Sequence, residues 1–412
     1  MNEPFTVNAI QMRGINRSAV LEIIRRHTAI DRSSIARQLN LSLPTVMRIV
    51  DGLVRDDLVR YSGQKLRSGG RMSILVEFNP CQLIVGVDMS STPFYGVVAD
   101  LGGKIHDEIT YPHDKTGEEA YQSLVNLIDA LLEKARLTGY PIRGIGVGVP
   151  GITRYADGIV MGSTILDWKE FPLKTRLLAQ FSMPVVVDNV VNLAAVGELW
   201  FGAGQNMRNL VVVTVGSGVG AGIIIDGMVY RGSHQAAGEI GHLLPGCSSV
   251  GQHFNGLGAM EEIISEAGIV KRAHRRLEEQ PLPPGQVHPG CSDRAAHFAC
   301  QKRETLSARD VFAAARQGQS WAQGVIDETV DYLAQAVASL SVTFDPDGII
   351  LGGGIAAEAD LLIEPILHRL EGALPILPNL LVSTLGFHAV VMGTLINLLY
   401  SSSELYVVQK LV

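Results

Sequence analysis

The sequence of 412 residues lacks the features that mark secreted and membrane-embedded proteins. No apolar run reaches the roughly 18 residues of a membrane span, and no basic segment followed by an apolar one opens the chain. Cysteine is scarce, and the spacing of the cysteines matches no disulfide framework. The four are Cys81, Cys247, Cys291 and Cys300. We therefore expect a cytoplasmic protein with reduced thiols. Its 47% hydrophobic content allows a large core.

Charge is divided unevenly along the chain. Residues 1–80 contain 12 Lys and Arg against 7 Asp and Glu, a net charge of +5. Residues 81–412 contain 22 against 34, a net charge of −12. A small basic module on a large acidic body is typical of a protein that binds a polyanion through one part only. The length suits two or three domains.

The basic module predicts three short helices within residues 16–61. Asp31 can cap the second helix, over 32–39, and Ser42 can cap the third. Two helices joined by a short turn, the second with polar and Arg side chains near its start, are typical of a helix-turn-helix that reads the major groove. The predicted base and backbone contacts of this helix are Ser42, Thr45 and Arg48.

Two β-prone runs follow, over 58–61 and 74–78, and a Gly-rich segment over 63–71 separates them. That segment carries Lys65, Arg67 and Arg71, so we expect a flexible basic hairpin tip that contacts phosphates or the minor groove. Helices and hairpin together predict a winged helix-turn-helix DNA-binding domain over residues 1–80. The alternative is a small helical domain with a solvated basic face.

The rest of the chain alternates strands, helices and Gly-rich turns, which predicts an α/β fold with parallel strands. Buried-strand runs fall at 83–89, 144–148, 184–187 and 348–351, and helical stretches at 117–138, 190–203, 307–317, 320–342 and 388–400. Two strand–turn–strand segments, beginning at Val85 and Val211, lie about 125 residues apart. This weak repeat indicates two similar lobes facing a cleft.

Several motifs together resemble the ROK family (repressor, open reading frame, kinase). They are Gly216–Ile224, Asp226–Gly232, Ala237–His242, Val149–Gly151 and Leu351–Ile355. The similarity spans nearly the whole chain and is greatest to the transcriptional branch typified by the sugar-responsive repressors Mlc and NagC. It implies a winged helix-turn-helix joined to a two-lobed, actin/hexokinase-like (ribonuclease H-like) domain, a sugar site between the lobes, and homo-oligomers. The expected domains are residues 1–80, a first lobe of 81–200 plus 386–412, and a second lobe of 201–385.

The residues needed for phosphoryl transfer are changed relative to the kinase members of this family. Those members carry an Asn-Asp pair after a strand, whose Asp is the base for the sugar hydroxyl. The corresponding stretch, anchored by Asn189, Asn192 and Glu198, places Val190 at the base position. Valine cannot accept a proton, and loss of a positioned base costs roughly 10²–10⁴ in rate. Asp188 could substitute only if the backbone shifted.

Two further sites depart from the family pattern. The family's Asp-x-Gly-Gly-Thr phosphate loop reads Asp88–Thr92 here, with two serines in place of the glycines and Pro93 following. The family's zinc site pairs a His with three cysteines, and beside His242 the corresponding residues are Gln252, Phe254 and Ala259, which provide no tetrahedral site. Cys247 and His253 lie nearby in the sequence and leave a chance metal site as an alternative. We expect no nucleotide or zinc cofactor and no catalytic residue.

The resemblance implies a retained sugar site made of Asn189, Glu239, His242 and Glu261, although Glu239 and Glu261 could instead be helix caps. We therefore predict a homo-oligomeric transcriptional regulator of carbohydrate-related genes, a repressor by resemblance, whose operator affinity responds to a sugar-like ligand. The alternatives are a sugar kinase that retains a DNA-binding arm and a regulator controlled by a protein partner.

Overall fold

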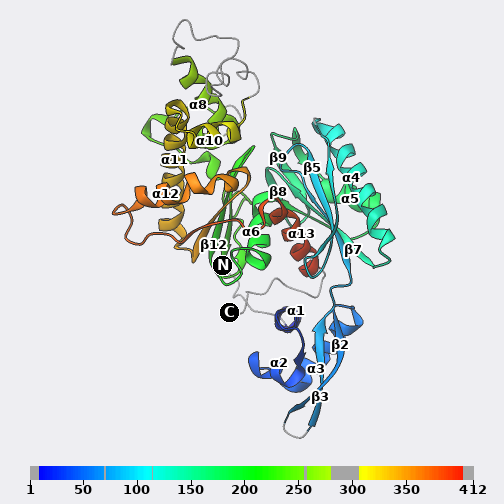
Figure 1. Cartoon of the computed structure of the whole chain (residues 1–412). Coiled ribbons are helices and arrows are strands. Elements are labelled where there is room, and N and C mark those ends of the chain that lie inside the picture. The colour runs from blue at the N-terminus through cyan, green and yellow to red at the C-terminus, as the bar shows by residue number, and fades with distance from the viewer. Residues whose placement is uncertain (1–8, 69–70, 114, 255–257, 280–305, 402–412) are drawn as a thin grey trace, which may run out of the picture. The chain divides into compact units, whose positions relative to one another are not determined.

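The computed structural model describes residues 9–68, 71–113, 115–254, 258–279 and 306–401. These residues form two compact units. The first contains residues 1–197, 226–228 and 390–412, and the second contains residues 198–225 and 229–389. We describe each unit separately (Figure 1).

The N-terminal part of the first unit is a module of three helices and a small sheet (Figure 1, blue). Its helices are α1 (Ala9–Arg26), α2 (Arg32–Gln38) and α3 (Leu43–Arg55). The sheet has the order β1-β3-β2, formed by β1 (Ile30–Asp31), β3 (Arg71–Phe78) and β2 (Val59–Ser68). All three helices and both predicted strands are therefore present.

Both predicted helix caps of this module are confirmed. The Asp31 carboxylate accepts hydrogen bonds from the backbone N–H groups of Ser33 and Ser34 at 2.9 and 3.0 Å. The Ser42 hydroxyl accepts one from the Thr45 N–H at 3.3 Å. Each cap satisfies donors that the first turn of a helix leaves without a partner, so the two short helices begin where the sequence places them.

The hairpin differs from the prediction. The segment from Gly63 to Arg71 was expected to be a flexible tip, but β2 continues to Ser68 and β3 begins at Arg71. Lys65 pairs with Ile74 and Arg67 with Met72 in the antiparallel register, which has an irregularity between Tyr61 and Lys65. Cross-strand pairing thus extends the ladder through residues whose composition alone indicates a loop.

The first unit also holds a five-stranded mixed sheet of order β11-β7-β4-β5-β6. Its strands are β4 (Leu83–Asp88), β5 (Phe94–Asp100), β6 (Ile105–Tyr111), β7 (Ile142–Val149) and β11 (Val185–Asn189). A separate three-stranded sheet has the order β10-β9-β8, formed by β10 (Trp168–Phe171), β9 (Ile159–Ser163) and β8 (Ile152–Arg154). Helices α4 (Gly117–Leu137) and α5 (Leu173–Phe181) share an apolar core with alternate residues of the strands, among them Val85 and Val87.

Two helices meet the other face of this sheet, α6 (Val190–Phe201) and α13 (Ala389–Tyr400). The approach is close enough to require glycine. A Cβ at Gly146 of β7 would lie 2.4 Å from Thr394 Cβ in α13, and a Cβ at Gly393 would lie 2.0 Å from the Leu193 carbonyl oxygen in α6. Any larger residue at these two positions would push α13 away from the sheet or from α6.

The second unit is built on another five-stranded sheet, of order β14-β13-β12-β15-β16. Its strands are β12 (Leu210–Val215), β13 (Val219–Ile225), β14 (Met228–Val229), β15 (Gly348–Gly352) and β16 (Leu380–Val382). Its α-helices are α7 (Glu261–Ile264), α8 (Glu266–Glu279), α10 (Ala308–Arg316), α11 (Ser320–Phe344) and α12 (Ile363–Leu370). Among its described residues it also has 3₁₀ helices at Ile240–His242, Cys247–Ser249, Gly354–Leu361 and Gly386–His388.

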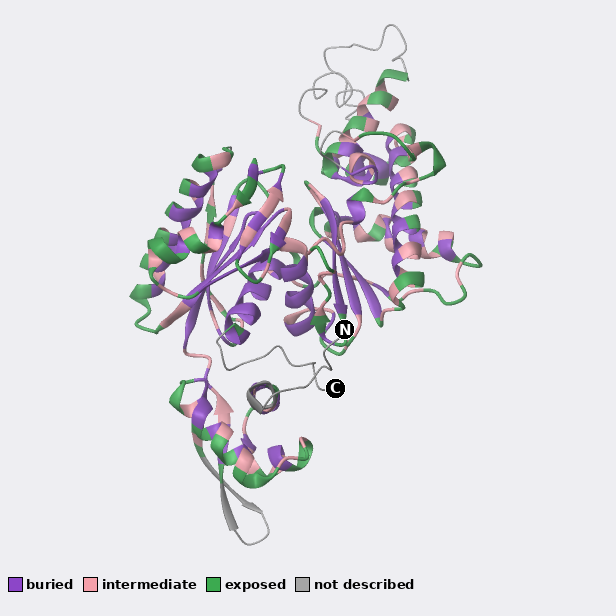
Figure 2. Ribbon diagram, turned by 180° about the vertical axis from the view of Figure 1, so that it is seen from behind, coloured by how far each residue is buried: buried purple, intermediate pink, exposed green. Residues whose placement is uncertain are grey.

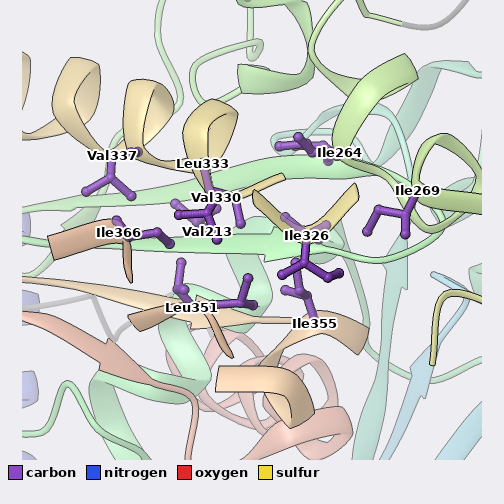
Figure 3. Packing of buried hydrophobic residues seen from close by; sticks show 14 of the residues in the cluster. Val213, Ile264, Ile269, Ile326, Val330, Leu333, Val337, Leu351, Ile355 and Ile366 are labelled. Carbon is purple, nitrogen blue, oxygen red and sulfur yellow. The ribbon is translucent and has the colours of Figure 1, made fainter. Parts of the chain in front are cut away.

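The core of the second unit joins its sheet to α11. Leu333 of α11 and Val213 of β12 are fully buried among the aliphatic side chains that Figure 3 shows at close range. Figure 2 shows the same buried character along the strands of both large sheets. This continuous aliphatic packing accounts for the nearly unbroken hydrophobic runs in the parallel strands.

The two large sheets have the same topology, which confirms the internal repeat. In each, an antiparallel hairpin (β4–β5 or β12–β13) is followed by parallel strands added on the far side of its first strand. The α/β prediction is correct. In the described part of the chain, no helix has the length and hydrophobicity needed to cross a membrane.

Glu198 is a fully buried carboxylate in the second unit. It accepts hydrogen bonds from the Ala203 N–H at 2.8 Å, the Ser383 hydroxyl at 2.5 Å and the Leu385 N–H at 3.3 Å. These bonds tie the segment after β16 to the end of α6. The three donors are half-buried, and Glu198 itself is fully buried, so its carboxylate depends on these bonds to compensate for its loss of hydration.

We predict that Glu198→Ala destabilises the protein by about 3 kcal/mol, since it removes three hydrogen bonds and leaves three half-buried donors without their acceptor. The measurement is calorimetric unfolding of the full-length chain. Glu279→Ala is the control, because this carboxylate is 65% exposed, and it should leave the unfolding temperature unchanged. Equal unfolding temperatures for the two variants would contradict the structural role of Glu198.

Candidate functional site

The junction of β11 and α6 holds the stretch that the resemblance to the ROK family predicted to correspond to the kinase Asn-Asp pair. Asp188 is fully buried. It accepts hydrogen bonds from the Asn189 N–H at 2.8 Å and from the Asn397 side-chain amide of α13 at 3.2 Å. A carboxylate held in this way supports the attachment of α13 to the sheet. It also faces a buried network, so its geometry gives no support to a role as substitute base.

Asn189 is the last residue of β11 and is 6% exposed. Its amide donates to the Gly151 carbonyl at 2.8 Å, and its carbonyl oxygen accepts from the Val191 N–H at 2.7 Å. Val190 begins α6 and is half-buried. At the position predicted for the base, the side chain of Val190 ends in two methyl groups, and Asp188 and Asn189 before it are engaged in hydrogen bonds.

The loop after β4 corresponds to the family's phosphate loop. Asp88 accepts a hydrogen bond from the Ser90 N–H at 2.8 Å, which closes the first turn of this loop. Burial raises the pKa of Asp88 to about 6, although its hydrogen bonds with Ser90 oppose the shift. Ser90 is half-buried and Ser91 is exposed, so their side chains stand in a loop where a phosphate-binding backbone needs open N–H groups.

In the second unit, Glu239, His242 and Glu261 lie close together beside the Gly-rich turn after β12. Burial raises the pKa of Glu239, as does the negative charge of Glu261, whereas His242 opposes the shift. Glu261 accepts hydrogen bonds from the Val219 N–H at 2.9 Å and the Gly258 N–H at 3.3 Å. One carboxylate therefore braces the Gly-rich turn, and Glu239 and His242 remain as donors and acceptors suited to hydroxyl groups.

The structure thus brings three of the four predicted sugar contacts together. Asn189 belongs to the first unit and is described there alone. Glu261 is the first residue of α7, but it does not cap this helix: α7 has no side-chain cap, and the N–H groups that Glu261 binds belong to Val219 and Gly258, outside the helix.

The four positions that correspond to the family's zinc ligands line a single pocket of about 280 Å³. They are His242, Gln252, Phe254 and Ala259, and His253 also contributes to the lining. Phenylalanine and alanine provide no donor atom, so this set does not fit a tetrahedral zinc ion. Within the described residues, no three His, Cys, Asp or Glu side chains gather as a metal site.

The predicted DNA contacts of the N-terminal module lie on three elements. Arg48 is exposed on α3. Lys65 and Arg67 lie on β2 and Arg71 on β3, where the structure describes the backbone only. Thr45 is half-buried, and its hydroxyl lies 2.8 Å from that of Ser42, so both hydroxyls take part in the cap of α3.

Sequence reasoning missed a polar cluster that joins these elements. The Arg32 guanidinium donates to the Tyr61 hydroxyl at 2.7 Å and lies 5.4 Å from the centre of its ring. The Tyr61 hydroxyl also donates to Asp51 at 3.4 Å. Residues from α2, α3 and β2 meet in this cluster, which orients the hairpin against the helices. The sequence signal that could have indicated this cluster was the presence of Arg32 on the second helix and Asp51 on the third, both outside the apolar stripes that form the core.

Comparison with known proteins identifies the larger part of the chain. A family model described as "ROK family" matches residues 84–397. The chain belongs to the ROK family. A glucokinase of Halalkalibacterium halodurans is 33% identical to it over 320 residues, which are 75% of this chain and 92% of the relative.

A second relative and a solved structure extend beyond the ROK domain. A putative xylose repressor of Caldicellulosiruptor sp. is 29% identical over 362 residues, 87% of this chain and 88% of the relative. The crystal structure of a ROK family transcriptional regulator, described as a homologue of the E. coli Mlc protein, covers 96% of this chain and 98% of its own. Its TM-score is 0.80 at 22% identity, which shows a common fold. These matches confirm the resemblance to the repressor branch of the ROK family.

We predict that Asp88→Asn stabilises the ROK domain in a pH-dependent way. The folded-state pKa of Asp88 lies above its ordinary value of 3.8, so the aspartic acid contributes stability below that value and loses it as the pH rises through about 6. Asparagine keeps an oxygen for the Ser90 N–H and cannot ionise. The gain should be about 2–3 kcal/mol at pH 7.5 and should vanish near pH 4.

Thermal unfolding of both proteins across this pH range is the measurement. Asp129→Asn, on the exposed side of α4, is the control and should not change the unfolding temperature at either pH. A gain of equal size at pH 4 and pH 7.5 would show that ionisation of Asp88 is not its cause.

Proposed function

We propose that this ROK protein is a DNA-binding transcriptional repressor of carbohydrate-related genes, with residues 1–80 as its winged helix-turn-helix domain. The observation that carries the proposal is the N-terminal module itself. Two capped short helices, α2 and α3, are followed by a basic hairpin, on a segment of net charge +5 attached to an acidic body. The matches to repressors support it, because they extend past the ROK domain that the glucokinase relative covers.

In this proposal α3 enters the major groove and the β2–β3 hairpin contacts the DNA backbone or minor groove. Arg48 contacts a base, and Lys65, Arg67 and Arg71 contact phosphates or the minor groove. Two copies of the chain in a homodimer bind two half-sites. A DNA partner is consistent with the cytoplasmic location expected from the sequence.

The proposed effector is a sugar-like molecule that contacts Asn189, Glu239, His242 and Glu261. A ligand that binds the DNA-free state more tightly than the DNA-bound state lowers operator affinity, and DNA lowers ligand affinity by the same factor. The raised pKa of Glu239 and the neighbouring imidazole of His242 support a site for hydroxyl groups. No nucleotide, metal or catalytic residue has a part in this proposal.

We expect Arg48→Ala to weaken binding to a sequence-selected duplex by about 1–3 kcal/mol and to relax sequence preference, because Arg48 contacts a base. Lys65→Ala should weaken binding to all sequences similarly and should lower the slope of log K against log salt by about 1. Binding of duplexes selected from a random library, at several salt concentrations, tests both. Arg136→Ala, an exposed cation of α4, is the control. Unchanged DNA affinity in both variants would refute the docking.

The second candidate function is a sugar kinase that retains the DNA-binding arm, and the glucokinase relative favours it. With Val190 at the base position we expect no ADP release with glucose or xylose, and a turnover above about 1 s⁻¹ would establish the kinase instead.

We also expect xylose or another sugar to raise the unfolding temperature and to lower DNA affinity. A sugar panel without effect, beside intact DNA binding, would favour control by a protein partner.

A further inference from the structure

The start of α3 offers few polar atoms to a DNA base. The Ser42 hydroxyl accepts from the Thr45 N–H and lies 2.8 Å from the Thr45 hydroxyl. Both hydroxyls therefore complete the helix cap, and Thr45 is half-buried. In the helix-turn-helix arrangement the N-terminal residues of the second helix contact base edges. Any direct contact with a base edge must then come from other side chains in the first turns of α3.

Two apolar side chains in the first turns of α3 are exposed. Leu43 is 42% exposed and Met47 is 40% exposed. They stand at i and i+4, so they adjoin on one face of α3, and the exposed Pro44 lies beside them. The core stripe of the same helix, Val46, Val50 and Leu53, is fully buried. Leu43 and Met47 thus form an apolar strip that keeps about 40% of its surface exposed to solvent, outside the core stripe of α3.

The surroundings of this strip indicate what covers it. Arg48 and Arg55 are exposed on the same helix, and no acidic residue lies between Leu43 and Val50. Cations beside an apolar strip suit a duplex, in which phosphates flank the groove. In the major groove the C5-methyl group of thymine is the apolar feature of the base edges, and aliphatic side chains contact it.

We propose that Leu43 and Met47 are specificity-determining residues that read thymine methyl groups in the operator half-site. This inference rests on the proposed DNA-binding function and goes beyond it, because it names the base and the side chains. Arg48, one position further along the helix, then lies next to the thymines that Met47 contacts.

The test uses the full-length protein and a half-site selected by it from random duplex DNA. Each thymine is replaced in turn by deoxyuridine, which keeps base pairing and removes only the methyl group. We expect about fourfold weaker binding at each contacted thymine, which corresponds to the loss of one buried methyl group. Met47→Ala should bind the thymine duplex about fourfold more weakly and should no longer respond to deoxyuridine at one position. Leu43→Ala should do the same at another.

Leu137→Ala is the matched control, since this leucine of α4 is 87% exposed. It should keep wild-type affinity and the full response to deoxyuridine. Met47→Leu should also keep the response, because an aliphatic contact remains. Unfolding temperatures should be equal for all variants, since the strip is exposed.

The outcomes separate the two proposals. If no sequence is enriched from the random library, the proposed DNA-reading function itself fails. If a half-site is enriched but deoxyuridine has no effect at any thymine, thymine reading is wrong and DNA binding stands. If Met47→Ala alters the oligomeric mass in solution and leaves the deoxyuridine response intact, the strip is a contact between protein chains.

Discussion

The hydrogen bonds of Asp188 join the end of β11 to α13, and the packing of α13 on the sheet of the first unit depends on them. This buried carboxylate accepts from the Asn189 N–H and from Asn397 of α13, and so holds the C-terminal helix to the sheet. The carboxylate therefore has a structural role where β11, α6 and α13 meet. Asp188 is engaged in this way, and Val190 at the start of α6 has a side chain that cannot accept a proton.

The same preservation of framework with altered chemistry occurs at the other sites. The pocket beside His242 is lined by Phe254 and Ala259, which carry no atom that binds a metal ion. The loop after β4 still turns at Asp88, but through a hydrogen bond from Ser90 and with a serine side chain exposed beyond it. Burial and backbone hydrogen bonds maintain a fold, whereas a few side chains determine the chemistry of a site. The chemistry of a site can therefore change while the fold remains.

Much of this architecture could be predicted because local signals and tertiary packing agree. Asp31 and Ser42 cap the helices that their types and positions predict, and the hydrophobic runs at 83–89 and 348–351 are buried strands. The hairpin was predicted less well. Its Gly and Arg residues indicate a loop, whereas the pairing of β2 with β3 extends almost to the tip, because strand propensity depends on the partner strand. The sequence predicted Ser42 as the cap of α3 but not the part of Thr45 in it, since a sequence shows the types of the residues and not the direction of their hydroxyls.

By itself, the sequence determined the class of the fold, the repeat of its two sheets and the positions of the helix caps in the N-terminal module, because each of these depends on residue type and spacing along the chain. Only the tertiary structure decided that Asp188 is buried against Asn397, that Glu261 braces the Gly-rich turn, and that Leu43 and Met47 remain exposed on α3. These facts depend on contacts between residues far apart in the chain or on the burial of one helix face. Such contacts form only when the whole core has packed.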